Sequence, residues 1–173
     1  KYRVSINNGT LVVYEVNDLV FEKLDSYNQP YDGAAHGGTI KGNKDDATFT
    51  YSVDGGEFTS TVPSLTDVGS ISVTVKMHLD GHGDITGSYT ISITQRYVTV
   101  TADDKEKTYG DADPTWTSTV SNPAPYGKES DIVRTVTCAD PHTDKGTYTI
   151  LATGNTDQGN YNVTFKNGTL TVK

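Results

Sequence analysis

The segment YNVTFKNGTLTV, residues 161–172, decides the fold class of this 173-residue chain. On both sides of its Asn-Gly pair, apolar and aromatic side chains alternate with polar ones, which is the period of a half-buried β-strand. The segment YRVSINNGTLVV, residues 2–13, repeats the pattern position by position. Asn-Gly between two alternating strands favours a two-residue type I′ turn, because both central residues need positive φ. Each copy therefore predicts a β-hairpin.

A second repeat, with a period of about 78 residues, lies between these two copies. Tyr31-Asp32-Gly33 matches Tyr109-Gly110-Asp111, and 109 − 31 gives a shift of 78. The segment DVGSISV at 67–73 matches DKGTYTI at 144–150, and 144 − 67 gives a shift of 77. Because the two shifts agree to within one residue, two modules of this length follow one another in the chain.

The repeat predicts three parts: a terminal hairpin of a preceding module at 1–15, a first module at 16–95 and a second at 96–173. The junction Thr94-Gln95-Arg96-Tyr97 has no Gly/Ser or Pro linker. A short polar junction of this kind predicts a stiff, extended arrangement of the modules. Since a lone two-stranded hairpin is marginal in water, we expect residues 1–15 to dock on the first full module or on another copy of the chain.

Period-two alternation recurs along the rest of the chain, and no stretch of ten or more residues keeps a helical period. The clearest runs are Phe49-Tyr51-Val53, Ile71-Val73-Val75-Met77, Tyr89-Ile91-Ile93, Val98-Val100-Ala102 and Tyr148-Ile150-Ala152. The 17 glycines and 11 tyrosines suit short strands joined by tight turns. We therefore predict an all-β fold of tandem antiparallel β-sandwich modules, immunoglobulin-like and elongated, with a β-grasp-like fold as the alternative.

Charge, hydropathy and cysteine content indicate which partners and cross-links the chain is not expected to have. A net charge of −8 and a pI near 4.8 would repel a phosphate backbone, which predicts no nucleic-acid partner. No apolar run is long enough to span a bilayer, so we expect no membrane insertion of this fragment. The single cysteine, Cys138, excludes an intrachain disulfide. It shares one side of the alternation with Val136, which predicts a buried structural thiol.

Two kinds of short motif indicate turns. In the Tyr-Asp-Gly and Tyr-Gly-Asp triplets at 31–33 and 109–111, Gly would supply positive φ, Asp would cap the turn and Tyr would pack over it. The alternative is an exposed aromatic beside an acid, which could grip a sugar. Asp67-x-Gly69 and Asp144-x-Gly146 are similar to the Asp-x-Gly-x-Tyr turn that precedes a late strand of immunoglobulin sandwiches, with Gly left-handed.

The sequence carries no catalytic or metal-binding motif that we can identify. Its four histidines lack HxH, HExxH and Cys-His spacing, and neither GxSxG nor SxxK occurs. The acids of DGHGD at 80–84 could offer oxygen ligands to Ca²⁺, but the loop lacks the bidentate acid of a calcium loop, which favours an ordinary polar hairpin loop. We predict no catalytic residue, no cofactor and no metal site.

Two aromatic residues are candidates for binding. Trp116 is the only tryptophan, and Tyr126 lies in a Pro-Ala-Pro-Tyr segment. Aromatic faces stack on sugar rings, so we expect these two side chains to carry any glycan binding. The alternative for Trp116 is that it covers the core of its own sandwich.

Longer stretches of the chain resemble repeats of bacterial surface adhesins. The series YDGAAHGG, YSVDGGEFTSTVPSLTDVGSISVTVK and GSYTISITQR resembles the YDG type of repeat. The series VTVTADDKEKTYGDADPTWT, DKGTYTI and GNYNVTFKNGTLTVK is similar to the MBG repeat of the YGX type, from which SNPAPYGKES at 121–130 departs. The opening hairpin resembles the end of a further MBG repeat. The resemblance implies a large, secreted, cell-wall-associated protein of a Gram-positive bacterium.

Three functions fit the repeat organisation and the family resemblance. The first is a non-enzymatic spacer that projects a distal binding region from the cell surface, with neighbouring repeats of the same chain as its partners. The second is a module that itself binds host glycan, mucin or protein. The third is an accessory module of a secreted carbohydrate-active enzyme.

Overall fold

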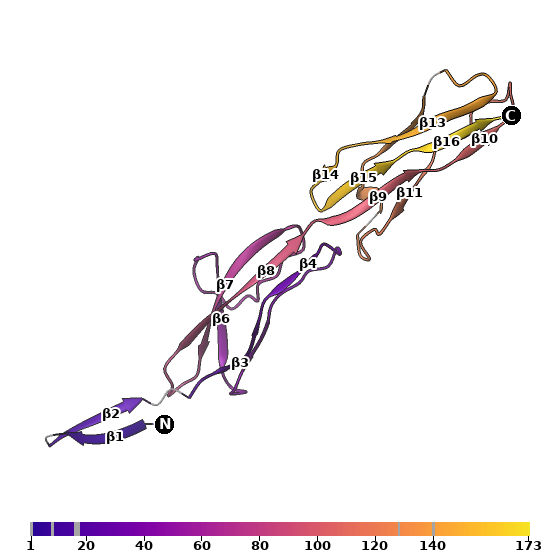
Figure 1. Ribbon diagram of the computed structural model, residues 1–173. Coiled ribbons are helices and arrows are strands. Elements are labelled where there is room, and N and C mark those ends of the chain that lie inside the picture. Colours follow the sequence, from indigo (N-terminus) through magenta and orange to yellow (C-terminus); the bar gives the residue numbers. More distant parts are fainter. Residues whose placement is uncertain (1, 8, 16–17, 128, 140) are drawn as a thin grey trace. The chain divides into compact units, whose positions relative to one another are not determined.

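The computed structural model describes residues 2–7, 9–15, 18–127, 129–139 and 141–173 (Figure 1). These residues form β-strands and one short 3₁₀-helix, η1 (Glu129–Asp131), with no α-helix among them. None of the described residues belongs to a helix that is long and apolar enough to cross a membrane. The predicted all-β fold class is confirmed.

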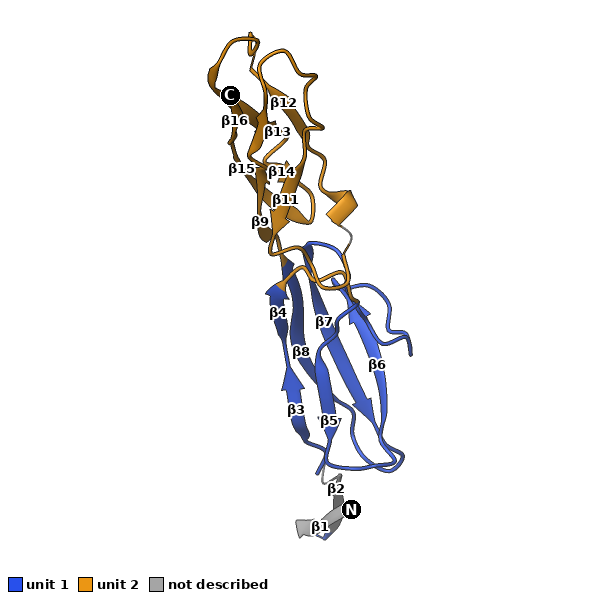
Figure 2. Ribbon diagram, turned by 90° about the vertical axis from the view of Figure 1, so that its right-hand side faces the viewer, with its two compact units in different colours: residues 1–29, 35–93 blue, residues 30–34, 94–173 orange. Residues whose placement is uncertain are grey.

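The chain divides into two compact units, coloured separately in Figure 2. Unit 1 comprises residues 1–29 and 35–93, and unit 2 comprises residues 30–34 and 94–173. The last strand of the first module, β8, ends at Thr94, and the first strand of the second, β9, begins at Arg96. One strand thus follows the other after a single residue, Gln95. The inclusion of residues 30–34 in unit 2 was not predicted.

The opening hairpin consists of β1 (Tyr2–Asn7) and β2 (Thr10–Glu15). The two strands pair antiparallel from Tyr2 opposite Glu15 to Asn7 opposite Thr10, and Gly9 has the predicted positive φ, 77°. This part of the hairpin prediction is confirmed. The side chains of the hairpin lie outside the described residues, so its docking stays a prediction.

Besides the β1–β2 hairpin, the described strands of unit 1 form two sheets. One has the strand order β4-β8-β7-β6, and the other pairs β3 with β5. Their bounds are β3 Phe21–Asp25, β4 Tyr27–Pro30, β5 Thr39–Gly42, β6 Thr48–Val53, β7 Gly69–His78 and β8 Ile85–Thr94. Alternate residues of β7 and β8 are buried, among them Val73, Val75 and Ile91, and Phe21, Leu24 and Ile40 of the second sheet pack against them. The predicted apolar faces of these strands are confirmed.

Unit 2 is a sandwich of two four-stranded sheets, with the orders β10-β16-β13-β12 and β11-β9-β15-β14. Their bounds are β9 Arg96–Ala102, β10 Lys105–Lys107, β11 Ser118–Ser121, β12 Thr135–Cys138, β13 Gly146–Thr153, β14 Asp157–Gln158, β15 Tyr161–Lys166 and β16 Gly168–Val172. Val100, Ile150, Val163 and Leu170 are fully buried between the sheets. The sandwich is not wholly antiparallel, because β9 pairs with β15 and β10 with β16 in parallel.

The sequence repeat is also a structural repeat. The sheet β4-β8-β7-β6 of the first module and the sheet β10-β16-β13-β12 of the second have the same strand order along the chain. The pair β3-β5 corresponds in the same way to β9-β11, and both pairs are antiparallel. Unit 2 adds β14 and β15 where unit 1 has a direct β7–β8 hairpin.

The predicted hairpin at 161–172 is wrong. Its two strands belong to different sheets: β15 pairs with β9 and β14, whereas β16 pairs with β13 and β10. Asn167 carries the chain from one sheet to the other, and Gly168 does not have positive φ. Glycine is needed at 168 for a different reason: a Cβ there would lie 2.5 Å from the carbonyl oxygen of Ala102.

Other turns agree in part with the predictions. Asp54 and Gly55, directly after β6, have φ of 50° and 80°, and the segment that follows pairs with β6 through a Tyr51–Thr59 bridge. Gly33 and Gly110 have the predicted positive φ, 88° and 87°. In the first of these turns the Asp32 carboxylate also accepts a hydrogen bond from the Ala34 amide at 2.9 Å.

Three further expectations about turns and burial need correction. Gly69 does not have the positive φ expected of the Asp-x-Gly turn, whereas Gly146 does, with φ 155°. Tyr109 is 57% exposed and does not pack over its turn. Cys138 is half-buried rather than fully buried, since β12 is the edge strand of its sheet.

One local feature matches the predicted immunoglobulin-like turn. The Tyr148 hydroxyl donates a hydrogen bond to the carbonyl oxygen of Asp144, four residues earlier, at 2.9 Å. A tyrosine that bonds back to the chain just upstream of a late strand is the tyrosine corner of immunoglobulin-like sandwiches.

Gly168→Ala should destabilise unit 2 by about 1–3 kcal/mol, because the added methyl group overpacks a contact between two backbone segments. Urea unfolding followed by the fluorescence of Trp116, the only tryptophan, measures this. Thr169→Ala is the control, since it changes an exposed side chain at the neighbouring position of the same strand of unit 2. Equal unfolding of both variants and the wild type would show that the close approach at 168 does not matter.

Candidate functional site

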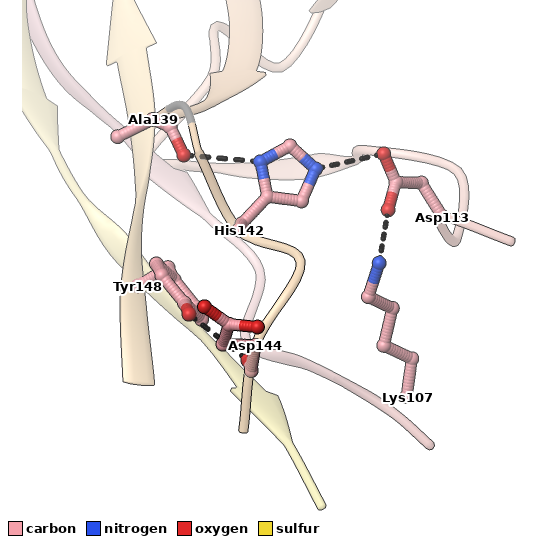
Figure 3. A network of polar contacts seen from close by, with 6 residues as sticks. All are labelled: Lys107, Asp113, Ala139, His142, Asp144 and Tyr148. Carbon is pink, nitrogen blue, oxygen red and sulfur yellow. Dashed lines mark hydrogen bonds and ion pairs between the residues drawn. The ribbon is translucent and has the colours of Figure 1, made fainter. Parts of the chain in front are cut away.

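Charged and aromatic side chains meet at the end of unit 2 that lies beyond β10. We call Lys107, Asp113, Trp116, His142 and Tyr148 the His142 cluster (Figure 3 shows its polar contacts). They come from three places: β10 and the loop after it, the loop between β12 and β13, and β13 itself. The fold therefore brings together residues up to 41 positions apart, from 107 to 148.

The polar half of the cluster is centred on the carboxylate of Asp113. Lys107 Nζ lies 2.6 Å from one of its oxygens, and His142 Nε2 lies 2.8 Å from the other. His142 Nδ1 faces the carbonyl oxygen of Ala139 at 3.0 Å. Since both ring nitrogens face acceptors, both contacts are hydrogen bonds only when both nitrogens carry a proton, that is, when the ring is cationic.

The two side chains that contact Asp113 are largely buried, whereas the Asp113 carboxylate is partly exposed. The side chains of Lys107 and His142 are only 10% and 13% exposed, whereas that of Asp113 is 42% exposed. The hydrogen bond from His142, and then that from Lys107, lowers the pKa of Asp113 below its ordinary value. One carboxylate thus contacts both the Lys107 ammonium group and the His142 ring.

The aromatic half of the cluster encloses the His142 ring. Trp116 meets this ring edge to face, with centroids 6.0 Å apart, and Tyr148 does the same at 6.3 Å. Trp116 is half-buried, and the packing partner that the structure gives it is His142. Trp116 therefore covers a histidine of the cluster while leaving part of its ring accessible.

A shallow depression of about 360 Å³ adjoins Trp116 and is lined by Trp116, Thr117, Ser118, Arg134 and Val136. Arg134 is held in place by two side chains: its Nε donates to the Ser118 hydroxyl at 3.0 Å, and its Nη2 pairs with Glu129 at 2.8 Å. An aromatic face, hydroxyl groups and a fixed guanidinium are groups that can hold a polar ring such as a sugar.

Tyr126, the second predicted binding residue, lies elsewhere. The antiparallel register of β11 with β9 runs from Ser118 opposite Ala102 to Ser121 opposite Thr99. Trp116 precedes β11 and Tyr126 follows it, so they lie beyond opposite ends of this strand. Tyr126 is 74% exposed. The structure does not combine the two residues into one site.

Sequence reasoning missed the charged members of the cluster. Lys107 and Asp113 are six residues apart and His142 is isolated, so neither spacing nor period marks them as partners. The 80–84 segment was interpreted correctly as the loop of a hairpin, since β7 pairs with β8 on either side of it. Asp84 bonds His78 Nδ1 at 2.6 Å, which raises the pKa of His78. Over the described residues, no group of three His, Cys, Asp or Glu side chains could hold a metal ion.

Asp113→Asn removes the charge shared by Lys107 and His142 and should destabilise unit 2 at pH 7. Because folding lowers the pKa of Asp113, its contribution is present above the unfolded-state pKa of about 3.9 and is lost as the pH falls through the folded-state pKa. The difference from the wild type should therefore shrink below about pH 4. Urea unfolding of both proteins at pH 7 and at pH 2–4 measures it.

Asp111→Asn is the matched control, because it removes the same charge from an exposed position in the same loop. It should change the stability little at either pH. A difference between Asp113→Asn and the wild type that is the same at pH 7 and pH 2 would contradict the role assigned to the carboxylate.

Comparison with solved structures finds distant similarity over most of the chain. One match is SGBP-B of the mixed-linkage glucan utilization locus of Bacteroides ovatus, solved in complex with a mixed-linkage heptasaccharide. It is 15% identical to this chain, and the match covers 91% of this chain and 48% of that one, with a TM-score of 0.33. The tandem Ig repeats of Dlar are 11% identical, with 90% and 97% covered and a TM-score of 0.31. The ectodomain of human desmocollin-1 is 13% identical, with 97% and 45% covered and a TM-score of 0.31.

The chain spans about half of the length of the Bacteroides ovatus protein. No curated protein matches it. The resemblance of the first module to the YDG type of repeat stays a prediction. Residues 98–171 match the family model described as the MBG domain of the YGX type, which confirms the MBG resemblance predicted for the second module.

Proposed function

We propose that this chain is a non-enzymatic repeat module of a large bacterial cell-surface adhesin and acts as a spacer that projects a distal binding region. The MBG match of residues 98–171 supports membership of a repeat protein. The shared strand order of the two modules supports a serial arrangement. An extracellular, cell-wall-associated location belongs to the same proposal.

The observation that carries the proposal is the path of the chain through unit 2. The chain enters at Arg96, the first residue of β9, and continues through β10 to Lys107. It leaves at Lys173, whose amide donates to the carbonyl oxygen of Lys107 at 3.0 Å. Entry and exit therefore lie at opposite ends of the sandwich, separated by roughly 35 Å at about 3.3 Å per residue. A module of this kind adds length each time it is repeated.

Small-angle X-ray scattering of the 173-residue chain tests the spacer role. A compact globule of this length has a radius of gyration of about 16 Å, and a spacer should give a clearly larger value. The expectation follows from the end-to-end path of unit 2 and the one-residue junction at Gln95. A radius of gyration near that of a globule would contradict the proposal.

A second candidate function, binding of host glycan, mucin or protein, is supported by the depression beside Trp116. Trp116→Ala should weaken binding to a glycan or mucin array by roughly tenfold or more, if the tryptophan face is the platform. Tyr126→Ala is the matched control, since it removes an exposed aromatic side chain far from this depression. Equal binding of the wild type and Trp116→Ala would exclude this site, and urea unfolding of the variant shows whether the fold survives.

A further inference from the structure

Residues 30–34, which precede β5 of the first module, are built into unit 2. Tyr31 is only 8% exposed, and its ring meets that of Tyr161 edge to face with centroids 5.4 Å apart. The carbonyl oxygen of Asp32 accepts a hydrogen bond from the amide of Tyr126 at 2.9 Å. We call residues 30–34 the plug, and Arg96, residues 122–127 and Tyr161 the socket.

The fit between plug and socket is close. A Cβ at Gly33 would lie 2.6 Å from the amide nitrogen of Gly127, and a Cβ at Gly127 would lie 2.5 Å from the Tyr161 hydroxyl. Only glycines allow this approach of two backbone segments. Arg96 fixes the socket loop, because its Nε donates to the carbonyl oxygen of Asn122 at 2.9 Å and its Nη2 donates to the Asn122 side chain at 2.8 Å.

The plug is anchored to the end of a strand, and the same anchor recurs 78 residues later. The amide of Tyr31 donates to the carbonyl oxygen of Thr94, the last residue of β8, at 2.9 Å. The amide of Tyr109 donates to the carbonyl oxygen of Lys173, directly after β16, also at 2.9 Å. Because β8 and β16 occupy the same position in sheets of the same order, Tyr109 is the structural counterpart of Tyr31.

The surroundings of the two tyrosines differ. Tyr31 is buried in the socket, whereas Tyr109 is 57% exposed. Gly33 is crowded by the socket backbone, whereas a Cβ at Gly110 would meet nothing within 4 Å. Both glycines have φ near 88°, although Gly33 is two residues after its tyrosine and Gly110 only one. The 109–111 loop is thus an exposed turn in the place where the first module carries its plug.

We infer that the Tyr109-Gly110-Asp111 loop is a plug for a further MBG-type module joined after Lys173. The socket begins at Arg96, two residues after Thr94, so a module joined with the same spacing would bring its own socket next to Tyr109. The partner is defined by chemistry: a buried tyrosine on a strand, a cationic guanidinium, and a loop with small residues like Ala124 and Gly127. This inference rests on the proposed serial arrangement and supplies the contact by which one repeat completes the next.

An extended protein tests the inference: this chain followed directly by a second copy of residues 95–173. Trp116→Phe in the first copy leaves the appended copy with the only tryptophan, whose fluorescence reports the urea unfolding of that copy. Tyr109→Ala in the first copy should raise the unfolding constant of the appended copy by roughly tenfold or more, the scale of a buried aromatic pair. Tyr97→Ala in the first copy is the control, since Tyr97 is 72% exposed.

The effects of Tyr31→Ala and Tyr109→Ala on urea unfolding are also measured in the 173-residue chain. There Tyr31→Ala should raise the unfolding constant reported by Trp116, whereas Tyr109→Ala should change it by no more than about twofold, as expected at an exposed position. An appended copy that fails to fold behind the unsubstituted Tyr109, or whose stability is the same with and without Tyr109→Ala, would overturn the inference. A compact scattering profile would reject the spacer role but not this inference, because the inference depends only on the effect of Tyr109→Ala on the stability of the appended copy.

Discussion

The close approach of Gly168 to the carbonyl group of Ala102 sets the architecture of unit 2. At this point the chain leaves the sheet of β15 and enters that of β16 without reversing its direction. Both strands therefore run in the same sense as β9 and β10, which gives the two parallel pairs. The same geometry places the entry at Arg96 and the exit at Lys173 at opposite ends. A side chain at 168 would push the two backbones apart.

Alternation was sufficient to predict the longer strands and their buried faces, because it reports which side of a strand meets the core. The short strands β3, β4, β5, β10, β11 and β14 were not predicted. Alternation was also not sufficient to predict which strands pair. Lys166-Asn167-Gly168 has the composition of a type I′ turn, and Asn7-Asn8-Gly9 has it too, yet only the second closes a hairpin. The difference comes from long-range partners: β16 finds β13 and β10, and those pairings outweigh a local turn preference.

The candidate sites likewise depend on long-range contacts that the local sequence does not predict. Trp116 could be singled out as a lone tryptophan, but its contact with His142 joins two loops that only the fold brings together. Lys107 and Asp113 carried no signal, since an isolated acid and an isolated base are found on most surfaces. Tyr31 was interpreted correctly as part of a turn, while its burial against Tyr161 depends on a module that begins more than sixty residues later.

The parallel pairing of β10 with β16 has a mechanical consequence. If tension is applied to a chain of such modules, Arg96 and Lys173 are drawn in opposite directions along the strands. The pair β10–β16 is then loaded lengthwise, so its three registered residue pairs resist sliding together instead of opening one after another. The six pairs between β9 and β15 reinforce the same axis. Resistance to stretching is thus built into the order of the strands.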